Sequence, residues 1–432
     1  MSTIFIIFHI LSSQLFQLSN ISTPTKTTFF IMKYTILIAA VMVLVQAAPL
    51  INNGSKAIPN SYIVVLKEGN TAATFQPKFN DIAKRQNGHG HKLTIHRTYS
   101  NIPGFAATIN AAALEEILAS DEGAQTSPPP PVITLQGAQT SPLPPVITLQ
   151  GTQTSPSSWG LTRVSQHDLD LTKPYLYNDA AGQGITAYVI DTGVYVSHSD
   201  FGHRATFGAN FVSGSADTDE HGHGTHVSGI IGGTKYGVAK KVDIVGVKVL
   251  DANGDGSVSD VIAGMEWVAA RAVPGKSVVN MSLGTEKLPS PAINRAALLL
   301  YEANIPLIVA AGNGGDACNI SPAGAPNTYT VAASDELDTP AYSTSYGSCV
   351  EIFAPGKRIN SAWIGSTTAN NTISGTSMAS PYVAGVAALY LSFNSLPTAQ
   401  SVFDKLTSTA TLNKINGNLM GSPNHLVFNG AA

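Results

Sequence analysis

Ser377 has the setting of either a helix cap or a catalytic nucleophile. It lies two residues after Gly375 and opens a run of small and apolar residues, 378–391, which predicts a buried helix despite Pro381 in its first turn. A serine at a helix start commonly caps it by accepting a backbone N–H. The same N–H groups and the helix dipole favour the oxyanion that forms when a hydroxyl attacks a carbonyl. Because serine alone is a weak nucleophile at neutral pH, the second role requires a base and a group that orients the base.

Asp191 and His223 have the residue types for these two roles. Asp191 directly follows the apolar run 185–190, so its carboxylate is expected at the end of a buried strand; a simple turn cap is the alternative. His223 lies at the start of a small-residue segment that predicts a helix. In the catalytic interpretation, His223 takes the proton of the Ser377 hydroxyl and later gives it to the leaving amine. Asp191 would fix the tautomer of His223 and stabilise its charged form.

Asn313 is the candidate for stabilising the oxyanion. It follows the apolar run 307–311, which predicts another buried strand. Its side-chain amide and the backbone N–H of Ser377 would together form an oxyanion hole.

The histidines at 221, 223 and 226 have a competing interpretation as a metal site. His223 and His226 have the spacing of two zinc ligands on a helix. No glutamate lies beside them to act as a base, and a third ligand would have to come from elsewhere. We therefore prefer the catalytic interpretation and keep a metallohydrolase as an alternative.

Buried strands alternate with helices through the second half of the chain. Strands are predicted at 185–190, 242–250, 278–283, 307–311, 329–333 and 350–353, and helices at 258–272, 291–304, 378–391 and 399–408. Continuous Val/Ile-rich strands separated by helices predict an α/β domain whose parallel sheet is covered on both faces. Ligands bind beyond the carboxyl ends of the strands in such sheets.

Three motifs of this half resemble those of the subtilisin family, and of its proteinase K branch in particular. They are Val-Ile-Asp-Thr-Gly at 189–193, His-Gly-Thr-His-Val-Ser-Gly at 223–229 and Gly-Thr-Ser-Met-Ala-Ser-Pro at 375–381. The resemblance covers residues 151–432, with Tyr382 where a histidine is common and Thr285 where a glycine is usual. It implies a three-layer subtilisin-like fold with a mostly parallel central sheet. It also implies a serine endopeptidase that works through an acyl-enzyme.

The resemblance also implies where a polypeptide substrate binds. An extended peptide would be held as an added strand between two backbone edges, formed by Gly254, Gly256, Ser282, Leu283 and Gly284. Ala311 and Gly312 would line the wall of the specificity pocket, with Ile320 near its base. Recognition through the backbone is indifferent to side chains, so we expect broad specificity, with an apolar or aromatic residue before the cut bond.

Residues 1–48 predict a leader. Lys33, the apolar run 34–45 and the small residues that follow it are typical of a secretory signal, and the run is too short to span a bilayer. We expect Met32 to be the true start. The expected destination is extracellular, with a vacuolar lumen as the alternative and no membrane attachment once the signal is removed.

Residues 49–122 predict a small α+β domain. It contains a strand-forming run at 61–67, an apolar segment at 105–109 and helical spacing at 111–120. The stretches 62–67, 102–107 and 114–117 resemble the inhibitory propeptide of subtilisin-type proteases. The resemblance implies that this domain aids folding and acts as an intramolecular inhibitor until it is cut.

A proline-rich repeat of 14 residues follows at 123–150. The motif Gly-Ala-Gln-Thr-Ser-Pro begins at Gly123 and again at Gly137, and a variant begins at Gly151. Such short copies predict an extended linker rather than a packed repeat domain. The linker differs from the family pattern, in which the propeptide normally ends in a docking strand. Either Leu149-Gln150 or Leu135-Gln136 is a candidate for the cut.

Calcium is the one inorganic partner that the sequence suggests. Residues 251–256 imitate the opening of an EF-hand loop, but Ile262 stands where the loop needs its glutamate. The proteinase K resemblance implies a different structural calcium site at Pro326, Thr328 and Glu351, with Glu in place of the usual Asp. No cofactor is required for the chemistry itself.

Cys318 and Cys349 are the two cysteines of the chain. In an oxidising compartment we expect them to form a disulfide beside the pocket, worth about 3–4 kcal/mol on the chain-entropy model. A pair of buried thiols is the alternative.

Composition gives no sign of two classes of partner. The 432 residues carry a net charge of −3 with 12% charged residues, which argues against a nucleic-acid or polybasic membrane partner. We expect a monomer whose partners are polypeptide substrates and its own propeptide. A catalytically silent, protease-like binding protein is the alternative from another functional class.

Overall fold

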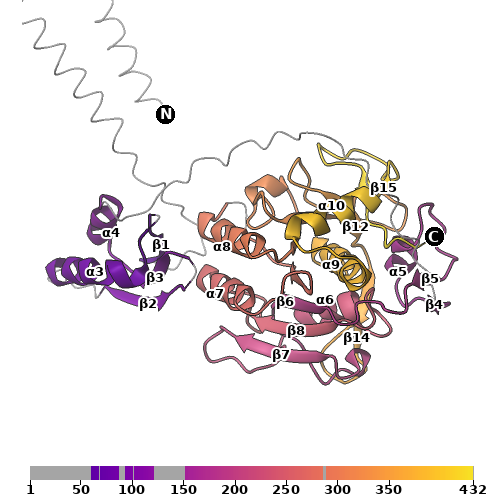
Figure 1. Ribbon diagram of the computed structural model, residues 1–432, viewed down its shortest axis with the longest axis horizontal. Helices are drawn as coiled ribbons and strands as arrows, with labels where there is room; N and C mark the ends of the chain where they lie inside the picture. Colours follow the sequence, from indigo (N-terminus) through magenta and orange to yellow (C-terminus); the bar gives the residue numbers. More distant parts are fainter. Residues whose placement is uncertain are drawn as a thin grey trace, which may run out of the picture.

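The computed structural model describes residues 60–67, 69–86, 93–100, 102–120, 151–285 and 289–431. The predicted leader at 1–48 and the predicted linker at 123–150 lie outside the described residues. The described part forms a small unit, up to residue 120, and a larger one from residue 151 onward (Figure 1).

A nine-stranded sheet is the middle layer of the larger unit. Its order is β15-β16-β12-β11-β10-β9-β6-β8-β7, and every neighbouring pair is parallel except β15 with β16. The strands are β6 (Thr186–Asp191), β7 (Ala205–Asn210), β8 (Asp243–Lys248), β9 (Ser277–Met281), β10 (Leu307–Ala310), β11 (Tyr329–Ser334), β12 (Ile352–Pro355), β15 (Thr411–Leu412) and β16 (His425–Leu426). The central strands β9, β10 and β11 are buried throughout, as expected for a sheet covered on both faces.

Helices cover both faces of this sheet, which confirms the predicted three-layer α/β architecture (Figure 1). One face carries α5 (Trp159–Val164), α6 (His223–Gly232), α9 (Thr376–Phe393) and α10 (Ala399–Thr409), and the other carries α7 (Val258–Ala269) and α8 (Pro291–Glu302). A separate hydrophobic cluster fills the space between the sheet and each helix layer. No helix within the described ranges combines the length and the apolar character that crossing a membrane demands.

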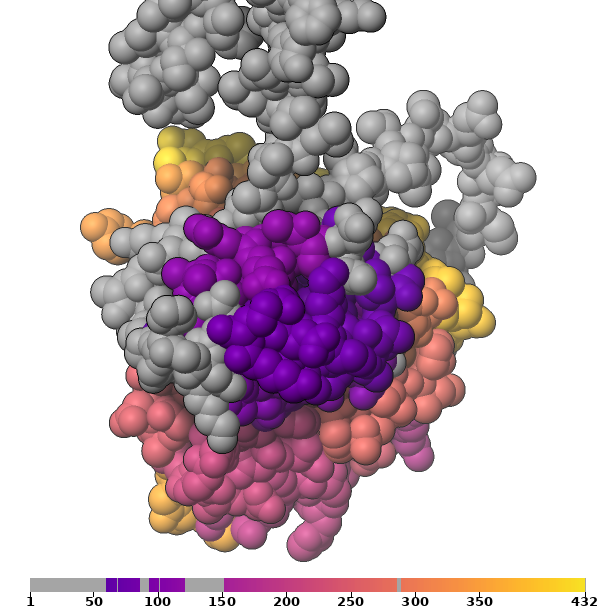
Figure 2. Space-filling view, turned by 90° about the vertical axis from the view of Figure 1, so that its left-hand side faces the viewer, coloured from indigo at the N-terminus to yellow at the C-terminus, as the bar shows by residue number. Residues whose placement is uncertain are grey.

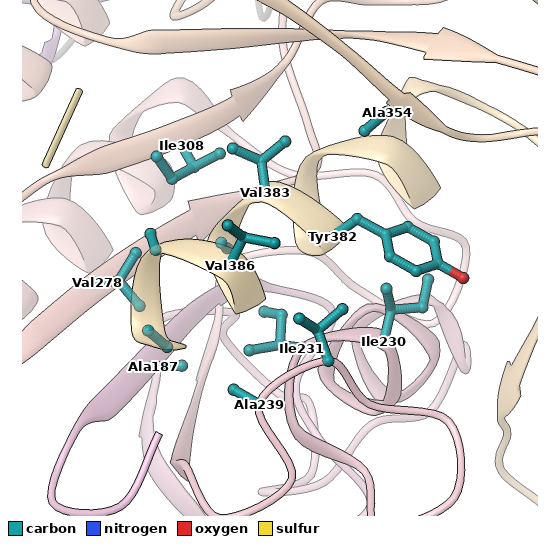
Figure 3. Close-up of a cluster of buried hydrophobic side chains, with 14 of the residues drawn as sticks. Ala187, Ile230, Ile231, Ala239, Val278, Ile308, Ala354, Tyr382, Val383 and Val386 are labelled. Atoms are coloured by element: carbon teal, nitrogen blue, oxygen red, sulfur yellow. The ribbon is translucent and has the colours of Figure 1, made fainter. Parts of the chain in front are cut away.

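Helix α9 is the centre of one hydrophobic cluster. Figure 3 shows Val383 and Val386 beside Ile308 and Val278 of the sheet, and all four side chains are fully buried. Burying each such aliphatic side chain contributes about 1.5–3 kcal/mol. The hydroxyl of Tyr382, on the same helix, donates to Ser158 Oγ at 3.0 Å, so this departure from the family pattern is accommodated as a bonded core residue.

Short elements complete the larger unit. They are two antiparallel two-stranded sheets, β4 (Gly151–Gln153) with β5 (Tyr175–Tyr177) and β13 (Ile359–Ala362) with β14 (Asn370–Ile373), and two 3-10 turns, η3 (Ser199–Phe201) and η4 (Ala317–Asn319). The sequence prediction missed all of them, because segments of three or four residues show too little periodicity.

The small unit is an α+β domain. Its antiparallel sheet has the order β1-β3-β2 and comprises β1 (Ser61–Val65), β2 (Thr94–Thr98) and β3 (Gly104–Thr108), covered by α3 (Ala72–Gln86) and α4 (Ala111–Leu118). Phe75, Phe79 and Phe105 pack in its core. Helix α4 begins where expected, since Asn110 accepts the N–H of Ala113 at 2.8 Å, and it ends two residues before the predicted 120.

The small unit contacts the larger one at α7 and α8 (Figures 1 and 2). Tyr99, Ile102 and Ala106 belong to the same hydrophobic cluster as the buried residues of these helices. The N–H of Ile102 donates to Glu266 Oε1 at 2.9 Å, and Arg97 pairs with Asp260 at 2.9 Å. The interface therefore combines apolar burial with charged hydrogen bonds.

Candidate active site

Asp191 and His223 are hydrogen-bonded to each other. Asp191 is the last residue of β6 and fully buried, whereas the prediction placed it just beyond the strand; His223 is the first residue of α6. His223 Nδ1 and Asp191 Oδ1 are 2.7 Å apart, and the N–H of Thr192 also donates to Asp191 Oδ1 at 2.8 Å. A carboxylate only accepts, so Nδ1 carries the proton and Nε2 of the neutral ring is left as an acceptor.

Charge around His223 favours its protonated form. Burial of the ring opposes protonation, but the charge of Asp191, the hydrogen bond to Asp191 and the charge of Asp219 outweigh it, so the pKa of His223 is raised. The side chain is still 20% exposed, so it can be reached from outside. An imidazole in this setting can accept a proton and hold the resulting charge next to a buried carboxylate.

His226 has a different environment from His223. Its Nε2 lies 3.2 Å from the carbonyl oxygen of Ile359 and 3.1 Å from that of Asn371, so it donates its N–H to the backbone. Burial lowers the pKa of His226 to about 4, so the ring is neutral at pH 7. Within the described ranges, no group of three or more His, Cys, Asp or Glu side chains is arranged to hold a metal ion.

Ser377 is the second residue of α9, and its hydroxyl is bonded to Ser282. Ser377 Oγ donates to the carbonyl oxygen of Ser282 at 3.1 Å, and Ser282 Oγ donates to the carbonyl oxygen of Ser377 at 2.8 Å. Among the described residues, no hydrogen bond joins Ser377 to His223. Helices α6 and α9, which carry these two residues, nevertheless pack directly against each other.

Asn313 has a fixed side-chain orientation. Its Oδ1 accepts from the N–H of Thr376 at 3.0 Å and from Thr376 Oγ1 at 3.3 Å. Thr376 Oγ1 in turn accepts from the N–H of Gly312 at 3.1 Å. Because the amide oxygen is bound on one side, the NH₂ end of Asn313 is directed away from Thr376 and left to donate. Sequence reasoning missed Thr376, although it directly precedes Ser377.

Two predicted substrate-binding glycines lie against the same side chain. A Cβ at Gly284 would be 3.0 Å from Ile320 Cγ2, and a Cβ at Gly312 would be 2.5 Å from Ile320 Cδ1. Gly312 also has φ +102°, which an L side chain rarely adopts. Ala311 is buried beside them. The residues predicted to form one edge and the pocket wall are therefore brought together around Ile320.

The other predicted edge, Gly254 and Gly256, follows β8. Gly254 lies in a turn with φ +79°, and a Cβ there would be 3.4 Å from His221 Nε2. Gly256 packs so closely that a Cβ would lie 2.4 Å from the carbonyl oxygen of Val249. Leu283 is half-buried beside Ser282 on the opposite edge. Glycine at both positions leaves the backbone of this edge without a side chain that would cover it.

Cys318 and Cys349 form a disulfide, which confirms the predicted pairing. Their Cα atoms are 5.3 Å apart, and the bond closes a loop of 31 residues in sequence separation. Cys318 lies in η4, two residues before Ile320. The disulfide therefore anchors the segment that supports the predicted pocket.

Glu351 is a half-buried carboxyl group that is bonded to Thr330. It accepts a short hydrogen bond from the N–H of Thr330, and burial raises its pKa to about 8. Thr328 Oγ1 donates to the carbonyl oxygens of Pro322 and Ala325. The site offers only oxygen donors, as calcium prefers, and no cationic side chain of the described chain pairs with Glu351. The type of donor at Glu351 therefore suits a calcium ion.

Comparisons with known proteins agree on one family. A family model described as the Subtilase family matches residues 182–425. The chain is 40% identical over 403 residues to Subtilisin-like protease 2 of Pseudogymnoascus destructans, covering 91% of this chain and 95% of the relative. It is 40% identical over 396 residues to a cuticle-degrading serine protease of Arthrobotrys oligospora, covering 87% of this chain and 92% of that relative. The crystal structure of a cold adapted subtilisin-like serine proteinase is 46% identical with a TM-score of 0.60, covering 64% of this chain and 99% of that one.

Proposed function

The chain belongs to the subtilase family and is a serine-type endopeptidase, and on this premise we propose that Ser377 is its nucleophile. His223 acts as the base, and Asp191 orients His223 and stabilises its charged form. The observation that carries this proposal is the 2.7 Å hydrogen bond between His223 Nδ1 and buried Asp191, which leaves Nε2 free to accept a proton.

The reaction proceeds in two halves. The Ser377 hydroxyl leaves the carbonyl oxygen of Ser282, gives its proton to His223 Nε2 and attacks the peptide carbonyl. The NH₂ group of Asn313 and the N–H of Ser377 donate to the oxyanion. His223 then gives the proton to the leaving amine, which leaves an acyl-enzyme. Water attacks the acyl-enzyme by the same proton transfers in reverse and releases the acid.

Substrate specificity is broad in this proposal. The peptide lies between the edge at Ser282–Gly284 and the edge at Gly254–Gly256 and is held mainly through its backbone. The pocket residues Ala311, Gly312 and Ile320 carry no charge, so an apolar or aromatic side chain before the cut bond is favoured.

The small unit acts as an intramolecular inhibitor, so the protein is made as a zymogen. Its contact with α7 and α8 supports this role, because it holds the unit beside the loop that leads to the Gly254–Gly256 edge. Removal of residues up to the catalytic domain would then release activity. The cut lies in the predicted linker, which is outside the described residues.

The protein is secreted and works as a monomer in this proposal. The disulfide between Cys318 and Cys349 supports an oxidising destination. A structural calcium ion would be held by the carbonyl oxygens of Pro326 and Thr328 with the Glu351 carboxylate, and it would supply stability rather than chemistry.

Labelling with a fluorophosphonate tests the proposed nucleophile. The mature protein should become labelled on Ser377, identified by peptide mass mapping, with loss of peptidase activity. Ser377→Ala should take no label, whereas the exposed Ser408→Ala should be labelled like the wild type. An unlabelled wild-type protein would instead support the protease-like binding protein, and inhibition by a chelator alone would support a metallohydrolase.

A further inference from the structure

Asp219 is a buried carboxylate that accepts five hydrogen bonds. It lies in the loop before α6 and is 4% exposed. Its Oδ1 accepts from Thr192 Oγ1 at 2.9 Å, from the N–H of His221 at 3.0 Å and from the N–H of Gly222 at 2.8 Å. Its Oδ2 accepts from the N–H of Thr225 at 2.8 Å and from Thr225 Oγ1 at 2.6 Å. Four of the five donors belong to residues at the start of the helix that carries His223.

The fifth donor, Thr192, connects Asp219 to the Asp191 turn. Thr192 Oγ1 gives its proton to Asp219 and accepts the N–H of Gly224 at 2.9 Å. The N–H of the same threonine donates to Asp191 Oδ1. One residue is therefore bonded to the carboxylate that holds His223, to the helix that carries His223 and to Asp219.

The turn after β6 and the start of α6 touch without room for a side chain. A Cβ at Gly224 would lie 2.1 Å from the carbonyl oxygen of Gly193 and 3.2 Å from Asp191 Cβ. At this separation a small displacement of the helix would lengthen the bond between His223 and Asp191. The position of α6 thus depends on the hydrogen bonds that fix its first turn.

The buried cation Lys248 is bonded to the same Asp191–Thr192 turn and not to Asp219. Lys248 Nζ donates to the carbonyl oxygens of Thr192 and Leu250 and lies 3.6 Å from Glu220. Among the described residues, no cationic side chain forms an ion pair with Asp219. The negative charge of Asp219 is therefore stabilised by N–H and O–H donors, and it acts on the nearby His223 ring.

We propose that Asp219 is a positioning residue of the protease, which holds the first turn of α6 on the Asp191–Thr192 turn and so keeps His223 bonded to Asp191. The proposal rests on the proposed function, in that it takes His223 as the base. In the sequence, Asp219 lies four residues before His223 and therefore outside the motif at 223–229.

The titratable and charged groups around His223 set the sign of the expected effect. Burial lowers the pKa of His223, and Asp191 on β6 and Asp219 raise it by more, whereas the neighbouring His226 is neutral at pH 7. His221 lies with its ring 6.3 Å from that of His223, and Lys248 and Glu220 lie on the Thr192 side. Removing the charge of Asp219 should therefore lower the pKa of His223, so that the base remains unprotonated to a lower pH.

Asp219→Asn is the direct test, because an amide has one acceptor oxygen and cannot accept at both ends. We expect kcat to fall about 100-fold with little change in KM, since misplacement of a catalytic group by about 1 Å has this cost. The acid limb of kcat/KM, and the His223 titration followed by NMR, should both shift to lower pH.

Asp200→Asn is the matched control. Asp200 is also a buried carboxylate, 7% exposed, and it accepts the N–H groups of Lys235 and Tyr236 beyond the other end of α6. This variant should lose stability while keeping its kcat and its acid limb. If Asp219→Asn and Asp200→Asn have the same kcat and the same acid limb of kcat/KM, Asp219 does not have the proposed role.

Thr192→Val and Thr192→Ser keep the test decisive if Asp219→Asn does not fold. Valine removes the hydroxyl that joins the turn, Asp219 and Gly224, whereas serine keeps it, so kcat should fall about tenfold in the first and stay near wild type in the second. Equal kcat in the two variants would contradict the proposal. A wild type that fluorophosphonate does not label would instead overturn the proposed function, and the role of Asp219 with it.

Discussion

The hydroxyl groups and carbonyls of Ser282 and Ser377 are bonded reciprocally. Ser377 Oγ donates to the carbonyl oxygen of Ser282 at 3.1 Å, and Ser282 Oγ donates to that of Ser377 at 2.8 Å. Ser282 follows β9 and belongs to the predicted substrate edge. The same pair of residues therefore links the end of a central strand, the start of α9 and the candidate nucleophile.

Ser282→Ala should destabilise the protein by about 1–3 kcal/mol. Ser282 Oγ is bonded not only to Ser377 but also to Ser380 Oγ at 2.9 Å and Asn280 Nδ2 at 3.0 Å, so its loss leaves buried polar groups without partners. Urea unfolding in the Ser377→Ala background avoids self-digestion. The exposed Ser408→Ala should change stability by no more than about 0.5 kcal/mol. Equal unfolding midpoints would exclude the role of Ser282.

As pH is lowered, activity should be lost with a midpoint above the usual imidazole pKa of about 6.5. Protonated His223 cannot take the proton of Ser377, and its pKa is raised because Asp191 and Asp219 outweigh burial. The acid limb of kcat/KM, measured with a neutral peptide substrate, reports this pKa. His203→Gln alters an exposed histidine outside the site and should leave the limb unchanged. A limb at or below 6.5 would contradict the raised pKa.

The raised pKa of His223 should stabilise the folded state at low pH. The pKa of His223 is higher in the folded than in the unfolded state, so its stabilising contribution is full below the unfolded pKa and disappears as pH rises through the folded one. Stability in the Ser377→Ala background, compared with His223→Gln in that background, isolates this contribution. A difference that grows with rising pH would have the wrong sign.

Asn313→Leu should lower kcat by about 10²–10³ with KM little changed. The magnitude is that of removing one oxyanion-hole donor in subtilisin, and it applies because Thr376 fixes the Asn313 amide oxygen and leaves the NH₂ end to donate. Steady-state kinetics on a peptide substrate measure it. Asn418→Leu, at an exposed position, is the control for the substitution itself. A rise in KM with unchanged kcat would assign Asn313 to substrate binding instead.

Central strands were predictable to within a few residues, and edge elements were not. Strands β10 and β11 are buried at every position because helices cover both faces of the sheet, whereas edge strand β7 has only one buried residue among six. Helix α3 was missed because it is largely polar and contains Pro77. The helix predicted at 258–272 ends at Ala269, and the strand predicted at 350–353 is Ile352–Pro355, since packing sets such ends.

For the site, the sequence predicted the pair of Asp191 and His223 because each stands at the end of a strongly patterned element. The contacts of Asp219 with Thr192 and of Ser282 with Ser377 were not predictable, because they join segments that meet only in the folded chain. Residue type and spacing therefore indicate which groups do the chemistry. Tertiary contacts decide which groups hold them in place.

Glu266→Ala should loosen the small unit from α7. Glu266 Oε1 accepts from the N–H of Ile102 at 2.9 Å and Oε2 from that of Ser100 at 3.3 Å, and a hydrogen bond to a charged group contributes about 1.5–3 kcal/mol. In the full-length Ser377→Ala protein, the Ile102 amide should exchange with solvent at least about tenfold faster. Glu302→Ala on α8, where the side chain faces Arg295, is the control. Unchanged exchange would mean that apolar contacts alone hold the unit.

Calcium should raise the Tm of the full-length Ser377→Ala protein, and EGTA should reverse the rise. A ligand at a thousand times its Kd adds about 4 kcal/mol to the folded state. Glu351 supplies the only carboxylate of the proposed site, so Glu351→Gln should remove most of the effect. The partly exposed Glu302→Gln should retain it. A calcium-induced rise of equal size in Glu351→Gln would place the ion elsewhere, and no rise in the parent protein would exclude a stabilising calcium ion at any site.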